Sequence, residues 1–354
     1  MYGLSKTPIK KSKAMKRIGN LYEQIISVEN LRRADEKARR GKLRTYGVRH
    51  HDKNREANII ALHEALRTKT YKTSEYDKFT VFEPKERLIF RLPYYPDRIV
   101  HHAVMNVLEP IWSKVFTHNT YSCIKKRGIE GCARQVDKII KKYKGKPLYC
   151  LKIDIKKFYP SINHDVLKRV VRKKIKDKDL LWLLDEIIDS AEGLPIGNYL
   201  SQFLANLFLA YFMHFVNEVL KLEATEYADD ICFFSDSKEK LHEAFKEISR
   251  YLADLDLKVK SNYQVFPIAK NRYDKSGRAL DYVGYKFYRE QKLIRKSIKK
   301  NFCRHVARLN KRNPPLPPKE YKQGICSWLG WAKHSNSKHL LKSIIKKEYY
   351  ASIL

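Results

Sequence analysis

The sequence predicts an α+β fold. Stretches with helical periodicity and stretches with strand patterning follow one another without strict alternation, which is typical of this class. No internal repeat is visible. The chain has 354 residues, of which 43% are hydrophobic, and this is enough to build two or three subdomains with cores of their own.

The first third of the chain is expected to be mainly helical. The expected elements are a basic arm over 1–20, a charged helix over 21–40, a helix over 55–71, a β-hairpin over 79–93 and a helix over 97–112 that ends near Pro110. Alternating apolar residues flank Pro84, Lys85 and Glu86, which predicts that the hairpin has a basic tip.

The rest of the chain mixes short strands with helices. The expected elements are a buried strand within 146–162, helices over 164–176 and 180–191, a loop over 192–198, a long apolar helix that includes 203–216, two short strands within 224–234, a helix capped by Asp236 or Ser237, a strand pair around Gly284, and a basic helical region broken at 313–318.

The charge of the chain points to a nucleic-acid partner. Lys and Arg number 73 against 39 Asp and Glu, which gives a formal charge of +34. A surface this basic repels itself unless a polyanion neutralises it, and the basic residues cluster. No long basic amphipathic helix dominates, so an anionic membrane is the weaker alternative and we expect no membrane partner.

The cysteines and the apolar stretches favour a cytoplasmic protein. None of the six cysteines forms a C-x-x-C pair, and Cys150 and Cys232 lie inside apolar runs, which predicts reduced, buried thiols and no zinc site. The longest apolar stretch, 203–216, is too short to span a bilayer. The basic N-terminus lacks the apolar segment of a secretory signal.

Three carboxylates stand where strand-forming sequence should carry no charge. Asp229 and Asp230 fall in the turn of "EYADDICFF", and Asp154 ends the apolar strand of "LYCLKID". If the hairpin packs beside that strand, the carboxylates converge and need a cation. Oxygen ligands at strand ends suit Mg²⁺, and two such ions can promote phosphoryl transfer. The alternative for Asp229 and Asp230 is an ordinary exposed turn.

Several motifs together resemble a reverse transcriptase. "YADD" in a hairpin follows "LKIDIKKFYPSINH" and "GLPIGNYLSQFLANLFL", in the order of that family, and the resemblance covers about residues 55–340. It implies a right-hand polymerase fold and RNA-directed DNA synthesis. The implied parts are a basic N-terminal arm and helix (1–54), fingers (55–150), a palm (151–290) and a helical thumb (291–354).

The resemblance also implies roles for individual residues. Asp154, Asp229 and Asp230 would be catalytic, and with the carbonyl of Ile155 they would hold two Mg²⁺ ions, for which Mn²⁺ can substitute. Tyr159 matches the steric gate against a ribose 2′-hydroxyl, with a packed core aromatic as the alternative and Phe158 as the expected core member of the pair.

The implied dNTP site draws on the fingers and on the loop before the apolar helix. Lys85 and Arg87 match positions that grip the triphosphate, with a solvated basic turn as the alternative. Ile155, Tyr159, Ile196, Gly197 and Gln202 complete the set of nucleotide contacts.

The loop "LPIGNYLSQ" resembles the enzymes of diversity-generating retroelements. Ile196 stands where many relatives have Gln, and Ser201–Gln202 replaces Ser-Pro. An isoleucine can only pack against the nascent base pair and offers it no hydrogen bond. Fewer polar contacts then test the geometry of the base pair, which fits errors at template adenines. The alternative is that Ile196 only fills space in the loop. This resemblance implies template RNA, cDNA or primer, dNTPs and a basic pentameric accessory protein as partners.

Other interpretations stay open. A retron or group II intron-like enzyme shares the chemistry, an abortive-infection polymerase works without a template, and a degenerate palm would only bind RNA. The general acid stays open between Lys258 and Lys260. Arg98 is a further candidate for phosphate contact, and His101 and His102 are interpreted as structural.

Overall fold

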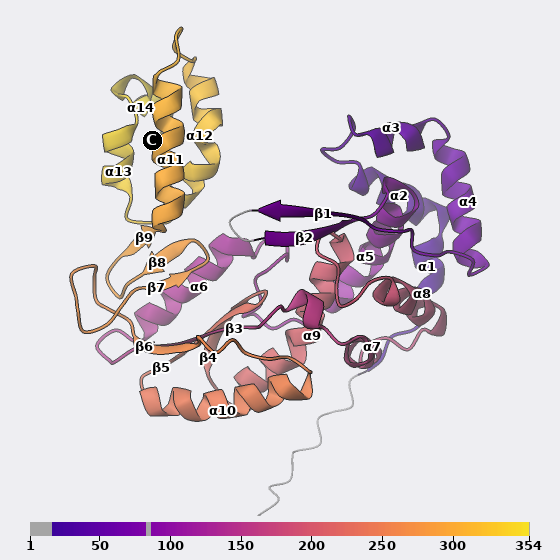
Figure 1. Ribbon diagram of the computed structural model, residues 1–354, viewed down its shortest axis with the longest axis horizontal. Coiled ribbons are helices and arrows are strands. Elements are labelled where there is room, and N and C mark those ends of the chain that lie inside the picture. Colours follow the sequence, from indigo (N-terminus) through magenta and orange to yellow (C-terminus); the bar gives the residue numbers. More distant parts are fainter. Residues whose placement is uncertain (1–15, 83–85, 354) are drawn as a thin grey trace, which may run out of the picture. The chain divides into compact units, whose positions relative to one another are not determined.

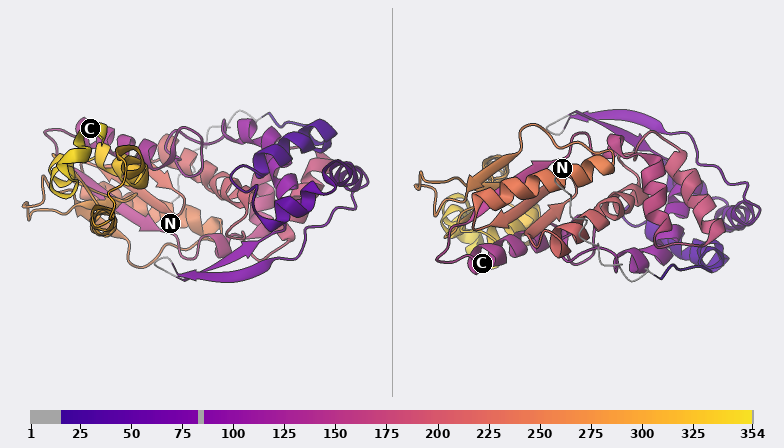
Figure 2. Two further views of the ribbon diagram at one scale, coloured as in Figure 1. Left: turned by 90° about the horizontal axis from the view of Figure 1, so that it is seen from above. Right: turned by 90° about the horizontal axis from the view of Figure 1, so that it is seen from below.

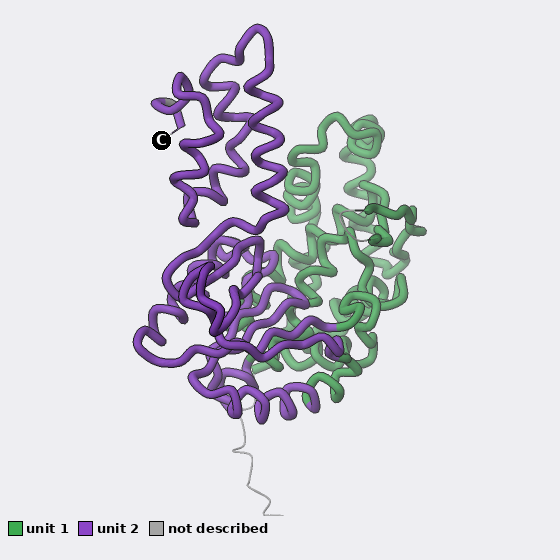
Figure 3. Tube along the Cα trace, turned by 60° about the vertical axis from the view of Figure 1, so that its left-hand side comes forward, with its two compact units in different colours: residues 1–117, 156–213, 251–258 green, residues 118–155, 214–250, 259–354 purple. Residues whose placement is uncertain are grey.

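The computed structural model describes residues 16–82 and 86–353 of the chain. The predicted basic arm therefore lies largely outside the described residues, as do Lys85 and the tip of the hairpin predicted over 79–93. The chain divides into two compact units, drawn in two colours in Figure 3. One unit contains residues 1–117, 156–213 and 251–258, and the other contains 118–155, 214–250 and 259–354.

The first unit is mainly helical. Its elements are α1 (Tyr22–Ile26), α2 (Val28–Ala38), α3 (Tyr46–Asp52), α4 (Arg55–Arg67), β1 (Asp77–Phe82), β2 (Glu86–Arg91), a helical turn over Tyr94–Arg98, α5 (Ile99–Trp112), a turn over Tyr159–Ser161, α7 (His164–Arg172), α8 (Lys178–Asp189) and most of α9 (Tyr199–Glu218). β1 and β2 form the antiparallel hairpin that the sequence predicted. The helix expected over 21–40 is broken at Ser27, whose side chain accepts a hydrogen bond from the Asn30 N–H and caps α2.

A buried carboxylate ties the helices of this unit together. Asp35 of α2 is fully buried and accepts hydrogen bonds from Arg39, from Arg55 of α4 at 2.6 Å and from the Tyr94 hydroxyl at 2.5 Å. These donors hold the pKa of Asp35 below its usual value although burial acts in the opposite direction. The network fixes the turn before α5, because Tyr94 belongs to that turn.

The helix predicted over 97–112 is confirmed, since α5 ends at Trp112, close to Pro110. The expectation that the apolar stretch 203–216 is too short to span a bilayer needs correction. The apolar helix α9 has 20 residues, more than the predicted stretch, and among the described residues it is the one helix long and apolar enough to cross a membrane. However, 72% of its apolar window is buried inside the protein.

The second unit is built on a four-stranded antiparallel sheet. Its elements are α6 (Gly128–Lys142), β3 (Tyr149–Asp154), β4 (Glu223–Tyr227), β5 (Asp230–Ser235), most of α10 (Lys238–Asp254), β6 (Gln264–Pro267), β7 (Leu280–Tyr282), β8 (Tyr285–Phe287), β9 (Lys292–Ile294), α11 (Lys296–Asn310), α12 (Pro318–Lys333), α13 (Lys338–Ile344), a turn over Lys347–Tyr349 and α14 (Tyr350–Ile353). The strand order is β4-β5-β3-β6. Figures 1 and 2 show α6 on one face of this sheet and α10 on the other.

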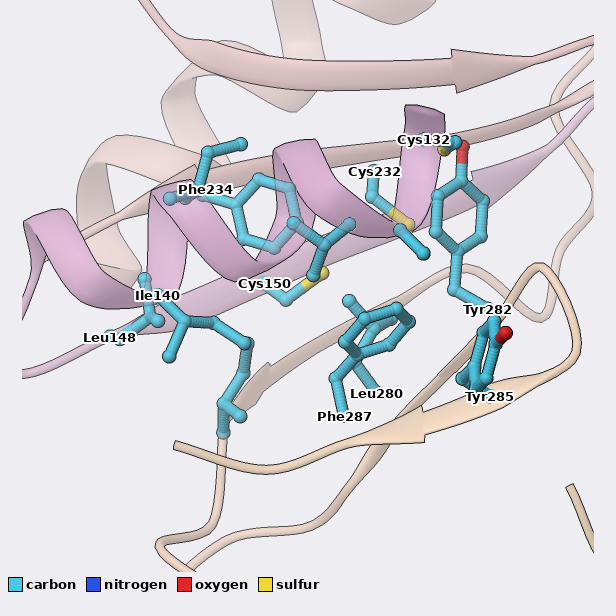
Figure 4. Close-up of a cluster of buried hydrophobic side chains, with 14 of the residues drawn as sticks. Cys132, Ile140, Leu148, Cys150, Cys232, Phe234, Leu280, Tyr282, Tyr285 and Phe287 are labelled. Carbon is cyan, nitrogen blue, oxygen red and sulfur yellow. The ribbon is translucent and has the colours of Figure 1, made fainter. Parts of the chain in front are cut away.

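One hydrophobic cluster joins α6, the sheet and the small β7–β9 sheet (Figure 4). Cys150 and Cys232 contribute buried thiols from β3 and β5, as the sequence predicted. Tyr282 and Phe287 enter the same cluster from β7 and β8, the strand pair predicted around Gly284. The cluster therefore fixes the end of β3 relative to β5 and β7, which is where the conspicuous carboxylates lie.

The observed architecture confirms the predicted α+β class, since helices accompany antiparallel sheets. Ser237 caps α10 by accepting a hydrogen bond from the Lys240 N–H, as predicted. The helices α3 and α6 and the strands β6 and β9 were not foreseen. A further hydrophobic cluster packs α11, α12 and α13 on one another on either side of the predicted break.

Candidate active site

The sheet of the second unit brings two of the three aspartates together. β3 ends with Asp154, β5 begins with Asp230, and these residues stand directly opposite each other in the antiparallel register. Since alternate residues of a strand share a face, Asp154 lies on the same face of β3 as Lys152 and Cys150. The spatial convergence expected from the sequence is therefore present, while the catalytic roles stay predictions.

The third aspartate lies in the turn between β4 and β5. Tyr227 pairs with Asp230, so Ala228 and Asp229 form a two-residue turn. The φ of Ala228 is +55°, in the region that favours glycine, and such strain is found most often at functional sites. The Ile155 N–H donates a hydrogen bond to the Asp229 carbonyl at 3.2 Å, which ties the turn to the end of β3.

Asp230 is partly buried and paired with a lysine. Lys152 Nζ donates to Asp230 Oδ2 at 3.1 Å and to the Asp281 carbonyl on β7 at 2.8 Å. Asp230 Oδ1 is buried and has no hydrogen-bond partner among the described residues. Burial raises the pKa of Asp230 to about 6, the charges of Asp154 and Asp229 add to the rise, and Lys152 opposes it.

Asp154 is paired with a second lysine. The Lys260 ammonium forms an ion pair with Asp154 Oδ1, and the Lys260 N–H donates to the Asp154 carbonyl at 2.9 Å. A backbone bridge between Ile155 and Val259 holds this segment in place. Of the two lysines that the sequence left open as general acid, Lys260 therefore lies beside a candidate catalytic carboxylate.

The carboxylates fit a divalent cation by their chemistry. Within the described parts of the chain, no group of three or more His, Cys, Asp or Glu side chains is placed to hold a metal ion as it stands. Lys152 pairs with Asp230, and Lys260 pairs with Asp154. The buried Asp230 Oδ1 lacks a partner, and the available donors are hard oxygens of the kind that Mg²⁺ prefers. An ion at Asp154 would have to take the place of the Lys260 ammonium.

A cavity of about 340 Å³ opens beside Asp154. Its lining residues are Lys152, Ile153, Asp154, Asn262, Gln264, Phe266, Arg278, Ala279 and Asp281. The Arg278 guanidinium lies 3.9 Å from the centre of the Phe266 ring and donates to Gln264 Oε1 at 2.5 Å. Cations and amides over an aromatic surface suit a ligand that carries both phosphate and a base.

Sequence reasoning missed two residues that support the aspartates. The Tyr282 hydroxyl lies 3.1 Å from the Asp230 carbonyl and 3.2 Å from the Thr225 carbonyl, so β7 holds the β4–β5 hairpin. Lys152 could have been found, because it precedes Asp154 by two residues on a strand and must share its face. Tyr282 gives no such local signal, since its partner is far away in the sequence.

Glu226 is a buried acid next to this hairpin. Its Oε2 accepts a hydrogen bond from the Thr120 hydroxyl at 2.8 Å, and its Oε1 has no hydrogen-bond partner among the described residues. Burial raises the pKa of Glu226 to about 8, although the Thr120 hydroxyl and the nearby Arg127 charge act in the opposite direction. The side chain is therefore mostly neutral at pH 7.

The remaining candidate residues gather in the first unit. The Phe90 N–H of β2 donates to the Ile196 carbonyl at 2.8 Å, which joins the β1–β2 hairpin to the loop before α9. Gly197 has a φ of +119°, and a Cβ there would lie 2.6 Å from the Phe90 carbonyl oxygen, so this close approach requires glycine. The Leu194 N–H donates to the Tyr159 carbonyl at 2.8 Å.

These contacts place Tyr159, Ile196 and Gly197 around one loop. Tyr159 is half-buried, and Phe158 is 3% exposed, which confirms that Phe158 is the core member of the pair. Gln202 is exposed on the first turn of α9, and Arg87 is exposed on β2. Lys85 lies outside the described residues.

Comparisons with known proteins show which family the chain resembles. The profile of the family "Reverse transcriptase (RNA-dependent DNA polymerase)" matches residues 78–287, which is more than half of the chain. Protein YkfC of Escherichia coli (strain K12) is 25% identical over 139 residues, which are 36% of this chain and 36% of that protein. Group II intron-encoded protein LtrA of Lactococcus lactis subsp. cremoris is 26% identical over 176 residues, which are 47% of this chain and 28% of that protein.

The chain thus spans about a third of the length of the curated relatives it matches. Among solved structures, apo telomerase from Candida tropicalis is similar, with a TM-score of 0.49 and 12% identity over 79% of this chain and 61% of that one. Telomerase from Candida albicans in complex with a fragment of telomeric RNA gives a TM-score of 0.47 and 11% identity over 78% of this chain and 57% of that one.

Proposed function

Since the chain belongs to the reverse transcriptase family, we propose that it is an RNA-directed DNA polymerase that copies a template RNA into cDNA. The right-hand polymerase fold implied by its motifs is the fold of that family. The observation that carries the proposal is the register of β3 and β5, which sets Asp154 opposite Asp230 with Asp229 in the adjoining turn. Carboxylates assembled at strand ends are what metal-assisted phosphoryl transfer requires.

We assign the metal site to Asp154, Asp229, Asp230 and the carbonyl of Ile155. Mg²⁺ is the proposed cofactor, as two ions, and Mn²⁺ would substitute. When bound, the ions supply Lewis-acid stabilisation of the attacking and leaving oxygens of the nucleotidyl transfer. The half-buried Asp230 with its unpartnered oxygen supports this assignment, because a cation would relieve the cost that its raised pKa reflects.

The chain's own side chains would then perform the remaining tasks. Lys152 holds Asp230 towards β7 and favours its ionised form, and Tyr282 fixes the backbone of the hairpin. Lys260 pairs with Asp154, and with a cation bound to that carboxylate its ammonium would be available to neutralise phosphate charge or to donate a proton to the leaving group. The cavity beside Asp154 provides polar and cationic walls for the reacting strand.

For the incoming dNTP we propose contacts from Lys85 and Arg87 to the triphosphate. Ile155, Tyr159, Ile196, Gly197 and Gln202 would surround the sugar and the base, with Tyr159 excluding a 2′-hydroxyl. The contacts of Ile196 with β2 and of Tyr159 with Leu194 support the grouping of those members that belong to the first unit, which excludes Ile155. The division into a basic N-terminal arm, fingers, palm and thumb belongs to the same proposal.

The finer function that we propose is diversification of a target gene by a diversity-generating retroelement. Ile196 supports it, because its half-buried side chain offers no hydrogen bond to the nascent base pair. With this function we also propose that the chain binds a basic pentameric accessory protein and that it acts in the cytoplasm. The similarity to a group II intron-encoded protein favours the second candidate, a group II intron-like enzyme acting on its own RNA.

A primer-extension assay tests the proposal. The full chain would be incubated with dNTPs, Mg²⁺ and a DNA primer annealed to an RNA template, and the products sequenced. We expect cDNA that depends on the template, with errors concentrated opposite adenine. Binding of RNA without any cDNA would contradict polymerase function, product without template would indicate an abortive-infection polymerase, and an even error spectrum would favour the group II intron-like function.

A further inference from the structure

The loop before α9, residues 190–198, is held at both of its ends by one tyrosine of the first unit. The Tyr76 hydroxyl lies 2.8 Å from the hydroxyl oxygen of Ser190, where the loop begins. The side-chain amide of Asn198, where the loop ends, donates to the same Tyr76 hydroxyl at 3.0 Å. These two contacts fix the ends of the loop, so its middle must be held by other groups.

The middle of this loop lies directly against the backbone of Tyr159. The Leu194 N–H donates to the Tyr159 carbonyl at 2.8 Å. Gly193 has a φ of +61°, and a Cβ there would lie 2.5 Å from the Tyr159 carbonyl oxygen and 2.7 Å from the Pro160 Cα, so this close approach also requires glycine. The position of Gly193 and the position of Tyr159 are therefore coupled through the backbone.

A histidine on α7 holds the loop in this close approach. His164 is the first residue of α7, directly after Asn163, whose side chain accepts a hydrogen bond from the Val166 N–H and caps the helix. The Nε2 atom of His164 lies 2.8 Å from the Gly193 carbonyl oxygen. Because a carbonyl can only accept, the ring donates from Nε2 in this contact.

Two further side chains orient the His164 ring. Its Nδ1 atom lies 3.2 Å from Oδ1 of Asp189, the last residue of α8. The other oxygen of this carboxylate accepts a hydrogen bond from Lys168 Nζ at 2.5 Å, and Lys168 is one turn further along α7. The His164 side chain is only 23% exposed. The ring is thus held between two helices, with Nε2 directed at the loop.

We propose that His164 is a positioning residue for the selection of the sugar. Its bond to the Gly193 carbonyl holds the loop against Tyr159 and so keeps the Tyr159 ring where it excludes a 2′-hydroxyl. This inference rests on the proposed function, in which Tyr159 is the steric gate. His164 itself acts through the backbone and does not contact the nucleotide. Loss of the bond should let the loop move away from Tyr159 and leave the gate less firmly placed.

Two amide substitutions separate the two contacts of the ring. His164→Gln places an amide nitrogen near the position of Nε2 and should keep the bond to Gly193. His164→Asn has a shorter side chain, which places its nitrogen near Nδ1 and within reach of Asp189 only. His242→Asn, on the exposed side of α10, makes the same change elsewhere and is the matched control.

The first measurement is hydrogen exchange at the Leu194 amide in the full chain, without RNA, dNTP or Mg²⁺. This amide is protected by its bond to the Tyr159 carbonyl, so its exchange reports how often the loop opens. We expect His164→Asn to speed this exchange about tenfold, as for the loss of one hydrogen bond, and the other two variants to change it by less than about twofold. Equal exchange in His164→Asn and wild type would overturn the inference.

The second measurement is the ratio of kcat/KM for a dNTP and its rNTP during primer extension. We expect His164→Asn to reduce this ratio roughly tenfold while the affinity for template and primer stays unchanged, and His164→Gln to keep the ratio of the wild type. A loss that His164→Gln shares with His164→Asn, or a ratio unchanged in both, would overturn the role in selection. A wild-type chain that makes no cDNA would remove the proposed function and with it this role, whereas faster Leu194 exchange in His164→Asn would still show that His164 holds the loop.

Discussion

The backbone N–H of Ile155 donates a hydrogen bond to the carbonyl of Asp229, at 3.2 Å. This contact closes the end of β3 against the turn between β4 and β5, so the residue before Ile155 and the residue after Asp229 become neighbours across two strands. The geometry of the carboxylate cluster is therefore set by the backbone. A side-chain change at Asp229 should alter chemistry without altering the fold.

Asp229→Asn should abolish cDNA synthesis and leave RNA affinity nearly unchanged. An amide keeps the shape of the carboxylate but loses the charge that a divalent cation needs. Primer extension and RNA binding would be measured on the same preparation. Asp254→Asn, an equal change at the exposed end of α10, is the control. Retained polymerisation in Asp229→Asn would remove this residue from the metal site.

Lys260→Met should tighten binding of Mg²⁺ to the free protein. The Lys260 ammonium is paired with Asp154, and a cation has to displace it, so removing the lysine removes a competitor. Isothermal titration with Mg²⁺ alone measures this effect independently of turnover. Lys258→Met is the matched control, because Lys258 is exposed and two residues away. Weaker or unchanged Mg²⁺ binding in Lys260→Met would show that the ion pair does not compete.

Ile196→Gln should reduce misincorporation opposite template adenine, by roughly tenfold. The backbone of Ile196 is anchored by Phe90, so the new amide would be presented where the apolar side chain now lies. A polar contact to the nascent pair adds discrimination that packing alone does not give. Sequencing of cDNA from wild type and variant measures the error spectrum, with Ile196→Val as an apolar control. An unchanged spectrum would place fidelity elsewhere.

Tyr159→Ala should admit ribonucleotides, with a loss of discrimination on the order of 10²-fold. The ring is half-buried, and its backbone is held by Leu194, so truncation should open space without moving the chain. The ratio of kcat/KM for a dNTP and its rNTP is the measurement. Tyr159→Phe keeps the ring and should keep the discrimination. Continued exclusion of ribonucleotides by the alanine variant would assign the gate to another residue.

Glu226→Gln should flatten the pH dependence of stability. In the folded chain the pKa of Glu226 is raised to about 8, whereas the ordinary value is 4.5. Between these values the folded state keeps a proton that the unfolded state has lost, so the free energy of unfolding falls as pH rises through this window. One proton corresponds to a slope of about 1.4 kcal/mol per pH unit.

Urea unfolding between pH 5 and 8 would compare the wild type with the Glu226→Gln variant. The glutamine amide can still accept the hydrogen bond from Thr120, which keeps the packing. Parallel stability curves for the two proteins would mean that Glu226 does not hold the proton. Arg127 is the charged group that acts on Glu226, and an Arg127→Met variant should therefore steepen the slope at the upper end of this window.

The aspartate cluster could be predicted because its signals are local. Asp154 ends one apolar strand and Asp230 begins another, and the pairing of these two strands brings the aspartates together. The same reasoning located the β7–β8 pair, since Gly284 lies at its turn. Lys152 lies two residues before Asp154 on the same strand and therefore on the same face, so it could have been predicted as a member of the site.

The other features of the site could not be predicted, because they depend on contacts between residues that are distant in sequence. Tyr282 reaches Asp230 only because β7 packs on the sheet, and the Lys260–Asp154 pair forms only because β6 runs beside β3. Helix α6 was missed although its apolar residues have a helical period, among them Cys132, Val136, Ile139 and Ile140. The sequence predicted a nucleotide contact for Ile196. It did not predict that the Phe90 N–H would donate a hydrogen bond to the Ile196 carbonyl, because these two residues are far apart in the sequence.

The path of the chain between the two units limits how the protein can be dissected. Each unit is assembled from separate stretches, with boundaries after residues 117, 155, 213, 250 and 258. No single truncation can release either unit intact, and a cut just beyond Ile155 would sever Asp154 from the segment that carries Tyr159. Fragments should therefore regain activity only when complementary pieces are expressed together, and a cross-link between stretches of one unit should preserve that unit after the backbone is cleaved.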